Sequence, residues 1–218
     1  MANASGRLLK VGGISLALSG LLFLVRLVAE LVAGPPPSTG AEILAWAARG
    51  RLPLAFVSEA LFIAGMLLVP GVVALHASVA NREGPMAAVG VGVLLVTLPV
   101  LFVTLVVHGR LVYEVYGLRV HDPTAAELTV ALYAGGMHAV FLMLAIATLI
   151  LSLAMSATYG RAIVGLGIAT AALDIAAAYP WALGAPLIVL CQVVFTAWFV
   201  AVGAKLFQLG SAAPVAAS

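Results

Sequence analysis

Charged residues are scarce in this chain. Ten Lys or Arg and eight Asp or Glu make up 8% of its 218 residues, whereas a soluble domain carries about 25%. Hydrophobic residues make up 64% of the sequence, and the mean hydropathy is +1.22. Such a chain cannot cover a globular surface with polar groups. The composition therefore excludes a soluble domain and predicts a multi-pass membrane protein.

Other absences exclude several kinds of function. Cys191 is the one cysteine, so the chain cannot form an internal disulfide or a Cys-x-x-Cys redox pair. The formal net charge is +2 and no basic run occurs, which argues against a nucleic-acid partner. We expect no metal or other cofactor, because the sequence lacks a His-Glu-x-x-His motif and a glycine-rich phosphate loop. A three-ligand metal site would need Glu59, His138 and Asp174 to converge.

Long apolar segments are the main feature that the sequence does contain. A transmembrane helix needs about 20 mostly apolar residues, and the long Val, Ile and Leu runs exclude membrane β-strands, which alternate apolar and polar residues. We therefore predict an all-α polytopic membrane bundle, a single transmembrane domain with six transmembrane helices. The predicted spans are residues 8–33, 52–80, 86–108, 129–155, 162–179 and 183–207.

The first predicted span has a second interpretation. Lys10 followed by an apolar run is also the pattern of a signal peptide, with cleavage near Ala33. The run is longer than the apolar part of such a peptide and contains Arg26 and Glu30, so we expect a retained first span. Gly34 and three prolines then end this helix.

Short polar segments separate the other spans. Residues 41–48 are predicted to form a short interfacial helix, and residues 81–85 and 159–161 to form tight turns. Residues 109–128 form the longest predicted connection. Gly13-x-x-x-Ala17 and Gly165-x-x-x-Ala169 permit close helix contact, although such patterns carry little weight in a chain this rich in alanine and glycine.

The basic residues indicate an orientation. Cytoplasmic loops carry an excess of Lys and Arg, and the side with both chain ends has five such residues against four on the other side. We therefore expect the N- and C-termini in the cytoplasm. The first set is Arg7, Lys10, Arg82, Arg161 and Lys205, and the second is Arg49, Arg51, Arg110 and Arg119.

Glu59 is the polar residue that most needs an explanation. It lies inside the second predicted span, where a carboxylate at the bilayer centre costs roughly 2.5–3.5 kcal/mol. At about 1.5 Å per residue, Arg26 lies roughly 8 Å and Glu59 about 10 Å to the outer side of the span midpoints, and His138 and Asp174 lie roughly 6 Å to that side. Four predicted helices thus place one ionisable group each in one layer, whereas the inner half holds almost no charge.

We interpret this layer as the floor of a pocket that opens to the outer leaflet. The candidate catalytic residues are Glu59, Asp174 and His138. Arg26 would keep one carboxylate ionised while the other holds its proton, which is the arrangement of an acid/base pair. The candidate substrate-binding residues are Arg26, Glu30, Phe102, His108, Tyr133, Phe141 and Trp181.

A structural role explains the same residues. Arg26 paired with Glu59 or Asp174 would fix the order of the helices and nothing else, and His138 would only hydrogen-bond a neighbouring span. His108, at a span end, is by itself more typical of a solvated anchor. Gln192 is expected to pack within its span rather than to bind a ligand.

Two stretches resemble known membrane proteins. LAFVSEALFIAGMLLVPGVVALH, around Glu59, and HAVFLMLAIATLILSLAMSATYGRAIVGLGIATAALDI, from His138 onward, resemble a family of uncharacterised six-span bacterial membrane proteins. In that family a glutamate also lies early in the second span, a histidine opens the fourth, and the last span ends in a pattern like Trp198–Lys205. The resemblance implies a six-span fold and a bacterial inner (plasma) membrane.

A looser resemblance concerns activity. One glutamate in an early span and one aspartate in a late span resemble the small integral-membrane terpene cyclases of meroterpenoid pathways, with Glu59 and Asp174 at the matching positions. In those enzymes such carboxyl groups protonate an alkene or epoxide of a prenylated substrate. They commonly have seven spans, one more than we expect in this chain.

Three classes of function follow. The first is a terpene cyclase-like enzyme that acts on a hydrophobic, prenylated small molecule among the membrane lipids. The second is a proton-coupled transporter or ligand-binding membrane protein that uses the same carboxylates, although the nearly uncharged inner half offers no polar route to the cytoplasm. The third is a non-catalytic membrane subunit. A homo-oligomer is left open.

Overall fold

The all-α class predicted from the sequence is confirmed. The computed structural model describes residues 2–212, apart from the side chains of residues 2–4 and 81–83, and this part of the chain contains helices joined by short connections and no strand. The helices are α1 (Ala2–Ala33), α2 (Gly40–Arg49), α3 (Arg51–Val112), α4 (Pro123–Ala154), α5 (Ser156–Tyr159), α6 (Arg161–Ala177), the 3₁₀ turn η1 (Pro180–Ala182) and α7 (Ala185–Ala212).

Five helical segments of the described residues are long and apolar enough to cross a membrane, so the chain is a multi-pass membrane protein. These segments are Ser5–Ala33, Arg51–Ala80, Gly84–Val112, Pro123–Ala154 and Ala185–Ala212. The sixth predicted span corresponds to α6, which has 17 residues. At 1.5 Å per residue it is about 26 Å long, a little less than the ~30 Å hydrocarbon core. Five of the six predicted spans therefore have a counterpart of full length.

α3 is a helical hairpin rather than one straight rod. A straight helix would separate Ser58 from His108 by about 75 Å, yet Ser58 Oγ lies 2.7 Å from His108 Nδ1. The backbone remains helical between the two spans, and the chain reverses its direction there. The two arms pair about residue 83, so the reversal lies within the segment 81–85, although the backbone there is helical and is not the tight turn that was predicted. The side chain of Arg82, counted in the orientation argument, lies outside the described residues.

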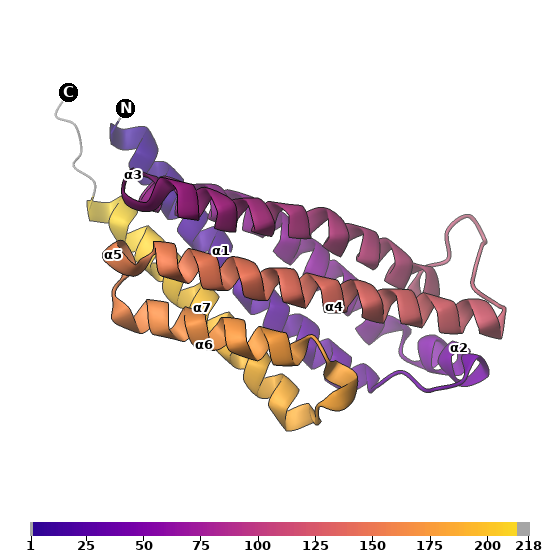
Figure 1. Cartoon of the computed structure of the whole chain (residues 1–218). Helices are drawn as coiled ribbons and strands as arrows, with labels where there is room; N and C mark the ends of the chain where they lie inside the picture. Colours follow the sequence, from indigo (N-terminus) through magenta and orange to yellow (C-terminus); the bar gives the residue numbers. More distant parts are fainter. Residues whose placement is uncertain (1, 213–218) are drawn as a thin grey trace.

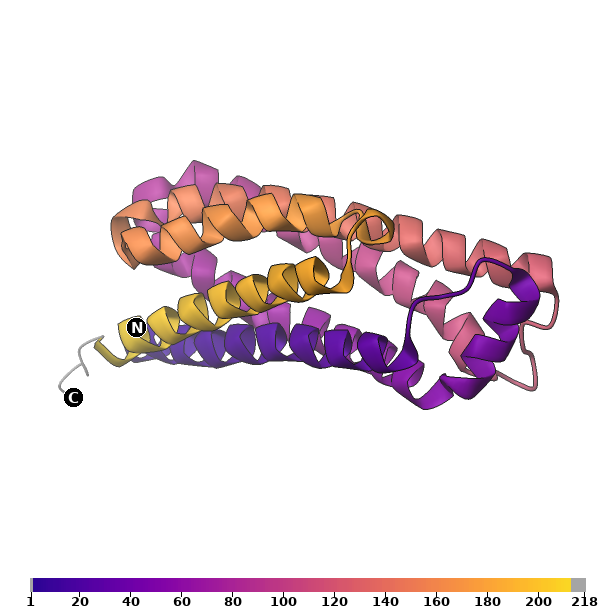
Figure 2. The same ribbon diagram turned by 90° about the horizontal axis from the view of Figure 1, so that it is seen from below.

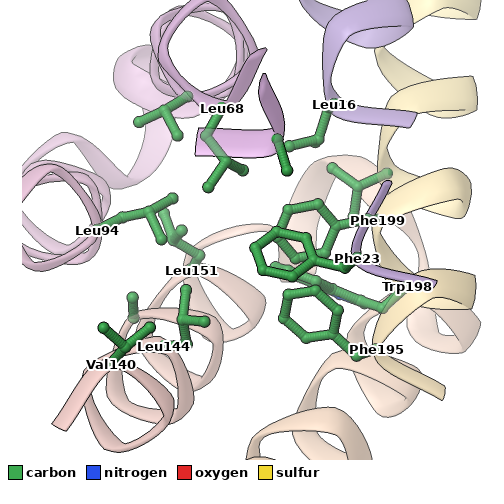
Figure 3. Close-up of a cluster of buried hydrophobic side chains, with 14 of the residues drawn as sticks. Leu16, Phe23, Leu68, Leu94, Val140, Leu144, Leu151, Phe195, Trp198 and Phe199 are labelled. Carbon is green, nitrogen blue, oxygen red and sulfur yellow. The ribbon is translucent and has the colours of Figure 1, made fainter. Parts of the chain in front are cut away.

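The long segments form a closed ring around one apolar core. α1 packs against the first half of α3 and against α7, the second half of α3 packs against α4, and α6 lies between α4 and α7 (Figure 1). Phe23 of α1 meets the rings of Phe195 and Phe199 at 5.0 and 6.2 Å. Leucines of α3 and α4 fill the other side of this core, as Figure 3 shows.

Glycines bring α1 and α7 into direct backbone contact. A Cβ atom built on Gly13 would lie 2.5 Å from the carbonyl oxygen of Gly203, and one built on Gly203 would lie 2.5 Å from that of Gly13. Gly210 lies against the Gly6 carbonyl in the same way, so both ends of the described chain meet at one end of the bundle (Figure 2). The predicted contact through Gly13 is confirmed. Gly165, by contrast, has no neighbouring atom within 4 Å beyond its own helix.

At the opposite end of the bundle, more residues are helical than the sequence predicted. The expected 20-residue connection at 109–128 is wrong in its bounds, because α3 continues to Val112 and α4 already begins at Pro123. Asp122 caps α4 by accepting a hydrogen bond from the Ala125 N–H at 3.0 Å, which is the usual role of an Asp before Pro at a helix start. The predicted short helix is α2, and Gly40 N–H donates to Glu127 of α4 at 2.7 Å.

Candidate functional site

The structure does not bring Glu59 into a shared pocket with Asp174, and this part of the sequence-based hypothesis is wrong. Ser58 is buried and faces the bundle interior, whereas Glu59 is exposed and accepts a hydrogen bond from the Tyr113 hydroxyl at 2.8 Å. Successive residues of a helix are rotated by about 100°. The one-residue step from Ser58 to Glu59 therefore turns the carboxylate out of the ring of helices.

Arg26 is the centre of a buried polar network in the half of the bundle away from the chain ends. Only 7% of this residue is exposed. Its Nη2 lies 2.7 Å from Glu30 Oε1 in an ion pair one turn along α1, and its Nη1 donates to Gln192 Oε1 of α7 at 3.4 Å. The guanidinium also lies 5.6 Å from the centre of the Phe141 ring of α4. The carboxylate that neutralises Arg26 is therefore Glu30, and not Glu59 or Asp174 as predicted.

The network continues across α4 to α3. The Tyr133 hydroxyl donates to Glu30 Oε1 at 3.3 Å, and the Tyr133 ring lies 4.4 Å from the His108 ring. His108 is only 2% exposed, and its Nδ1 is hydrogen-bonded to Ser58 Oγ at 2.7 Å. The interpretation of His108 as a solvated anchor is wrong. Its role as a binding residue stays a prediction.

Sequence reasoning missed two members of this network, Ser58 and Gln192. Ser58 lies 25 residues before and His108 25 residues after residue 83, the middle of the predicted turn at 81–85. Residues at equal distance from the turn of a helical hairpin lie at equal depth. The pairing of Ser58 with His108 could therefore have been predicted from the sequence. The contact of Gln192 with Arg26 depends on how α7 packs against α1, for which the sequence carries no comparable signal.

Asp174 lies on a different side of α7 from Arg26. Gly167 of α6 lies against Trp198 of α7. The two helices are antiparallel, so seven residues further along each of them Asp174 lies opposite Cys191. Asp174 is 1% exposed, and its Oδ2 has no hydrogen-bond partner. The carboxyl group is therefore enclosed by apolar and weakly polar groups.

His138 of α4 contacts the end of α6. Its Nδ1 is 2.7 Å from the carbonyl oxygen of Ala178, which follows Asp174 by one helical turn. The His138 ring packs against Tyr179 at 4.8 Å and Trp181 at 5.8 Å. His138 therefore meets α6 one turn beyond Asp174, whereas Asp174 itself faces Cys191 of α7.

The remaining candidate binding residues are divided between the bundle's interior and its surface. Phe141 is buried beside Arg26, and Trp181 is 64% exposed near His138. Phe102 is partly buried against the apolar core and packs against Phe62 with a ring separation of 5.3 Å, and it makes no contact with the network. No group of three His, Cys, Asp or Glu side chains that could hold a metal ion occurs in the described part of the chain.

A groove lies beside the network. It has a volume of about 560 Å³ and opens between the second half of α3 and α4. Its lining is apolar apart from Thr104, which lies one turn before His108 and against Gly136. Further lining residues are Pro99, Val103, Val107, Leu132 and Gly135. Val103 and Leu132 are 65% and 54% exposed, so the groove is apolar and lies open on the surface of the bundle.

Two buried donors of the network lack acceptors. Arg26 Nε and Gln192 Nε2 have no hydrogen-bond partner, although buried polar groups are normally paired. No family model, curated protein or solved structure matches the chain. The resemblances noted from the sequence therefore stay predictions.

Proposed function

We propose that this protein binds a lipid-like small molecule with a polar end in the outer half of the membrane. The observation that carries this proposal is the pair of buried donors, Arg26 Nε and Gln192 Nε2, that have no acceptor. An oxygen-bearing polar group would supply acceptors for them beside Tyr133. The groove between α3 and α4 would take an apolar chain, such as a prenyl chain, because it begins within one turn of His108.

Photo-crosslinking tests this proposal. The protein in lipid nanodiscs is irradiated with a farnesylated phenol that carries a diazirine on its chain, and the labelled peptides are mapped by mass spectrometry. We expect labelling in the groove. Gly135→Leu fills the groove from a position with open space around it, and should reduce labelling by about tenfold or more, the loss that follows when a hydrocarbon chain is excluded from its site.

A matched control variant is available. Gly165→Leu adds the same side chain at another open, exposed helix position, away from the groove, and should leave labelling unchanged. Tyr133→Phe, which removes the hydroxyl that donates to Glu30, should weaken binding, and Tyr179→Phe should not. Equal labelling of wild type and Gly135→Leu would overturn the groove as the site.

We further propose six membrane crossings, with both termini in the cytoplasm of a bacterium and the protein in its plasma membrane. The ends of α1 and α7 meet at Gly6 and Gly210, which requires an even number of crossings. α6 supplies the sixth. The Lys and Arg count favours the cytoplasm for these ends. A membrane-impermeant maleimide applied to intact cells should label Thr124→Cys but not Ser5→Cys, both at exposed positions.

A second candidate function is proton-initiated cyclisation of a bound prenyl chain, as in the integral-membrane cyclases. It is favoured by Asp174, whose Oδ2 is buried without a partner, since an acid that protonates an alkene must be neutral and shielded from water. The alkene takes the Asp174 proton, and the resulting carbocation forms a ring bond with a second alkene. The Asp174 carboxylate then regains a proton from the cyclised cation, directly or through His138, which regenerates the acid. The Trp181 ring, which lies 5.8 Å from the His138 ring, would stabilise the cation.

Asp174→Asn separates the two candidate functions. It removes the transferable proton and keeps the size of the side chain. We expect it to abolish conversion of a farnesylated phenol, followed by mass spectrometry of extracted products, and to leave photo-labelling of the groove intact. Undiminished conversion by this variant would remove the catalytic role of Asp174, whereas loss of labelling would point to a role in folding or binding.

A further inference from the structure

Glu59 places a carboxylate on the lipid-facing surface of a membrane-spanning helix. It lies eight residues after the start of the span Arg51–Ala80, about 12 Å along the helix axis. The neighbouring positions of the same face are apolar and exposed: Phe56 by 54% and Ile63 by 47%. An ionised side chain among such neighbours is costly in a bilayer unless a cation or a proton neutralises it.

The described part of the chain contains no counterion for Glu59. Its two ion pairs join other side chains. Arg51, on the same helix, instead donates from Nε to the carbonyl oxygen of Val112 at 3.1 Å. The Tyr113 hydroxyl orients the carboxylate through a hydrogen bond of 2.8 Å. This bond satisfies one lone pair, and the rest of the carboxyl group is exposed on the surface of the α3 hairpin.

We propose that Glu59 anchors a lipophilic cation on this face, separate from the Arg26 network. The positive group lies against the carboxylate, and its apolar substituents lie against Phe56 and Phe62. Phe62 is 49% exposed. Aromatic faces attract cations as well as apolar groups, so the surface matches both parts of such a ligand.

The carboxylate of Glu59 favours a cation, rather than a second copy of the chain, as the ligand of this face. A two-fold dimer through this face would bring each patch against itself, and two Glu59 carboxylates would then repel each other. A ligand with one delocalised positive charge meets no such repulsion. It is also able to reach a site about 10 Å from the span midpoint through the lipid, because its charge is weakly hydrated.

Tetraphenylphosphonium and the isosteric anion tetraphenylborate test this site. Binding of each ion to the protein in nanodiscs is measured by equilibrium dialysis against empty nanodiscs. We expect saturable binding of the cation and none of the anion. Glu59→Gln should raise the Kd of the cation by about tenfold or more, because it removes an ion pair that is partly shielded from water. Glu114→Gln is the matched control, since that exposed carboxylate is paired with Arg119, and it should leave the Kd unchanged.

Several outcomes would overturn the site. They are an unchanged Kd in Glu59→Gln, equal saturable binding of both ions to wild type, or a dimer that forms through Glu59 without any cation. If Glu59→Gln does not fold, wild-type protein still gives an answer. A hydrophobic carbodiimide should modify Glu59, as mapped by mass spectrometry, and tetraphenylphosphonium should protect it; modification that continues at saturating cation counts against the proposal.

Discussion

Ser58 Oγ and His108 Nδ1 lie 2.7 Å apart although 49 residues separate them in the chain. Both are buried, at 6% and 2% exposure. This hydrogen bond joins the two arms of the α3 hairpin close to their open ends, and it links α3 to the network of Tyr133, Glu30 and Arg26. The position of His108 inside the bundle therefore depends on the serine that precedes Glu59.

Removal of the Ser58 hydroxyl should destabilise the protein. Ser58→Ala leaves a ring nitrogen of His108 buried without its partner, which costs about 1–3 kcal/mol. Unfolding in mixed detergent micelles should show this loss. Ser211→Ala is the control, because its hydroxyl donates to the Phe207 carbonyl at an exposed position, and it should change stability by less than about 0.5 kcal/mol. Equal stability of the Ser58→Ala variant and wild type would show that the hydrogen bond contributes nothing.

The contact of α1 with α7 should depend on the absence of side chains at its glycines. Gly203→Ala would place a methyl group 2.5 Å from the Gly13 carbonyl oxygen, so the helices must separate, at a cost of about 1–3 kcal/mol or more. Gly165→Ala, with open space around its Cβ, should be neutral or stabilising by up to about 1 kcal/mol. Thermal denaturation of both variants in the same detergent compares them directly. A smaller effect at Gly203 than at Gly165 would contradict the packing described above.

Tyr113 should titrate at unusually high pH. Burial raises the pKa of Tyr113 to about 12, and the hydrogen bond to Glu59 and that residue's charge act in the same direction. The pKa is raised in the folded state, so the contribution of the neutral phenol to stability is complete below about pH 10 and is lost as the pH rises through about 12. The difference in tyrosinate absorbance between wild type and Tyr113→Phe isolates this group. In Glu59→Gln the titration midpoint of Tyr113 should move back toward pH 10. An unmoved midpoint would show that Glu59 does not influence the phenol.

The start of α4 should depend on the Asp122 side chain. Asp122→Ala removes the acceptor of the Ala125 N–H, and loss of such a cap costs about 0.5–2 kcal/mol. Asp122→Asn retains an acceptor oxygen and should retain most of the stability. Hydrogen exchange of the Ala125 and Ala126 amides should report the same difference, with faster exchange in the alanine variant alone.

Helix positions and reversals could be predicted from the sequence because they depend on local properties. Proline and glycine after Ala33 end α1, the turn at residues 81–85 separates two apolar runs, and Tyr159-Gly160-Arg161 marks the connection into α6, where Gly160 adopts a positive φ of 86°. Counting residues also predicts a common depth for Arg26, Glu59, His138 and Asp174. Depth alone did not say which of them meet.

The sequence by itself determined that this chain is an all-helical membrane protein, because apolar runs of this length leave the backbone no other way to satisfy its hydrogen bonds in lipid. Only the tertiary structure decided the chemistry, through the rotation of each helix about its own axis. In a chain that is apolar on every side, periodicity does not reveal which face is buried. A rotation of about 100° directs Ser58 to His108 and Glu59 to the lipid, and adjacent residues of α7 face Asp174 and Arg26 separately.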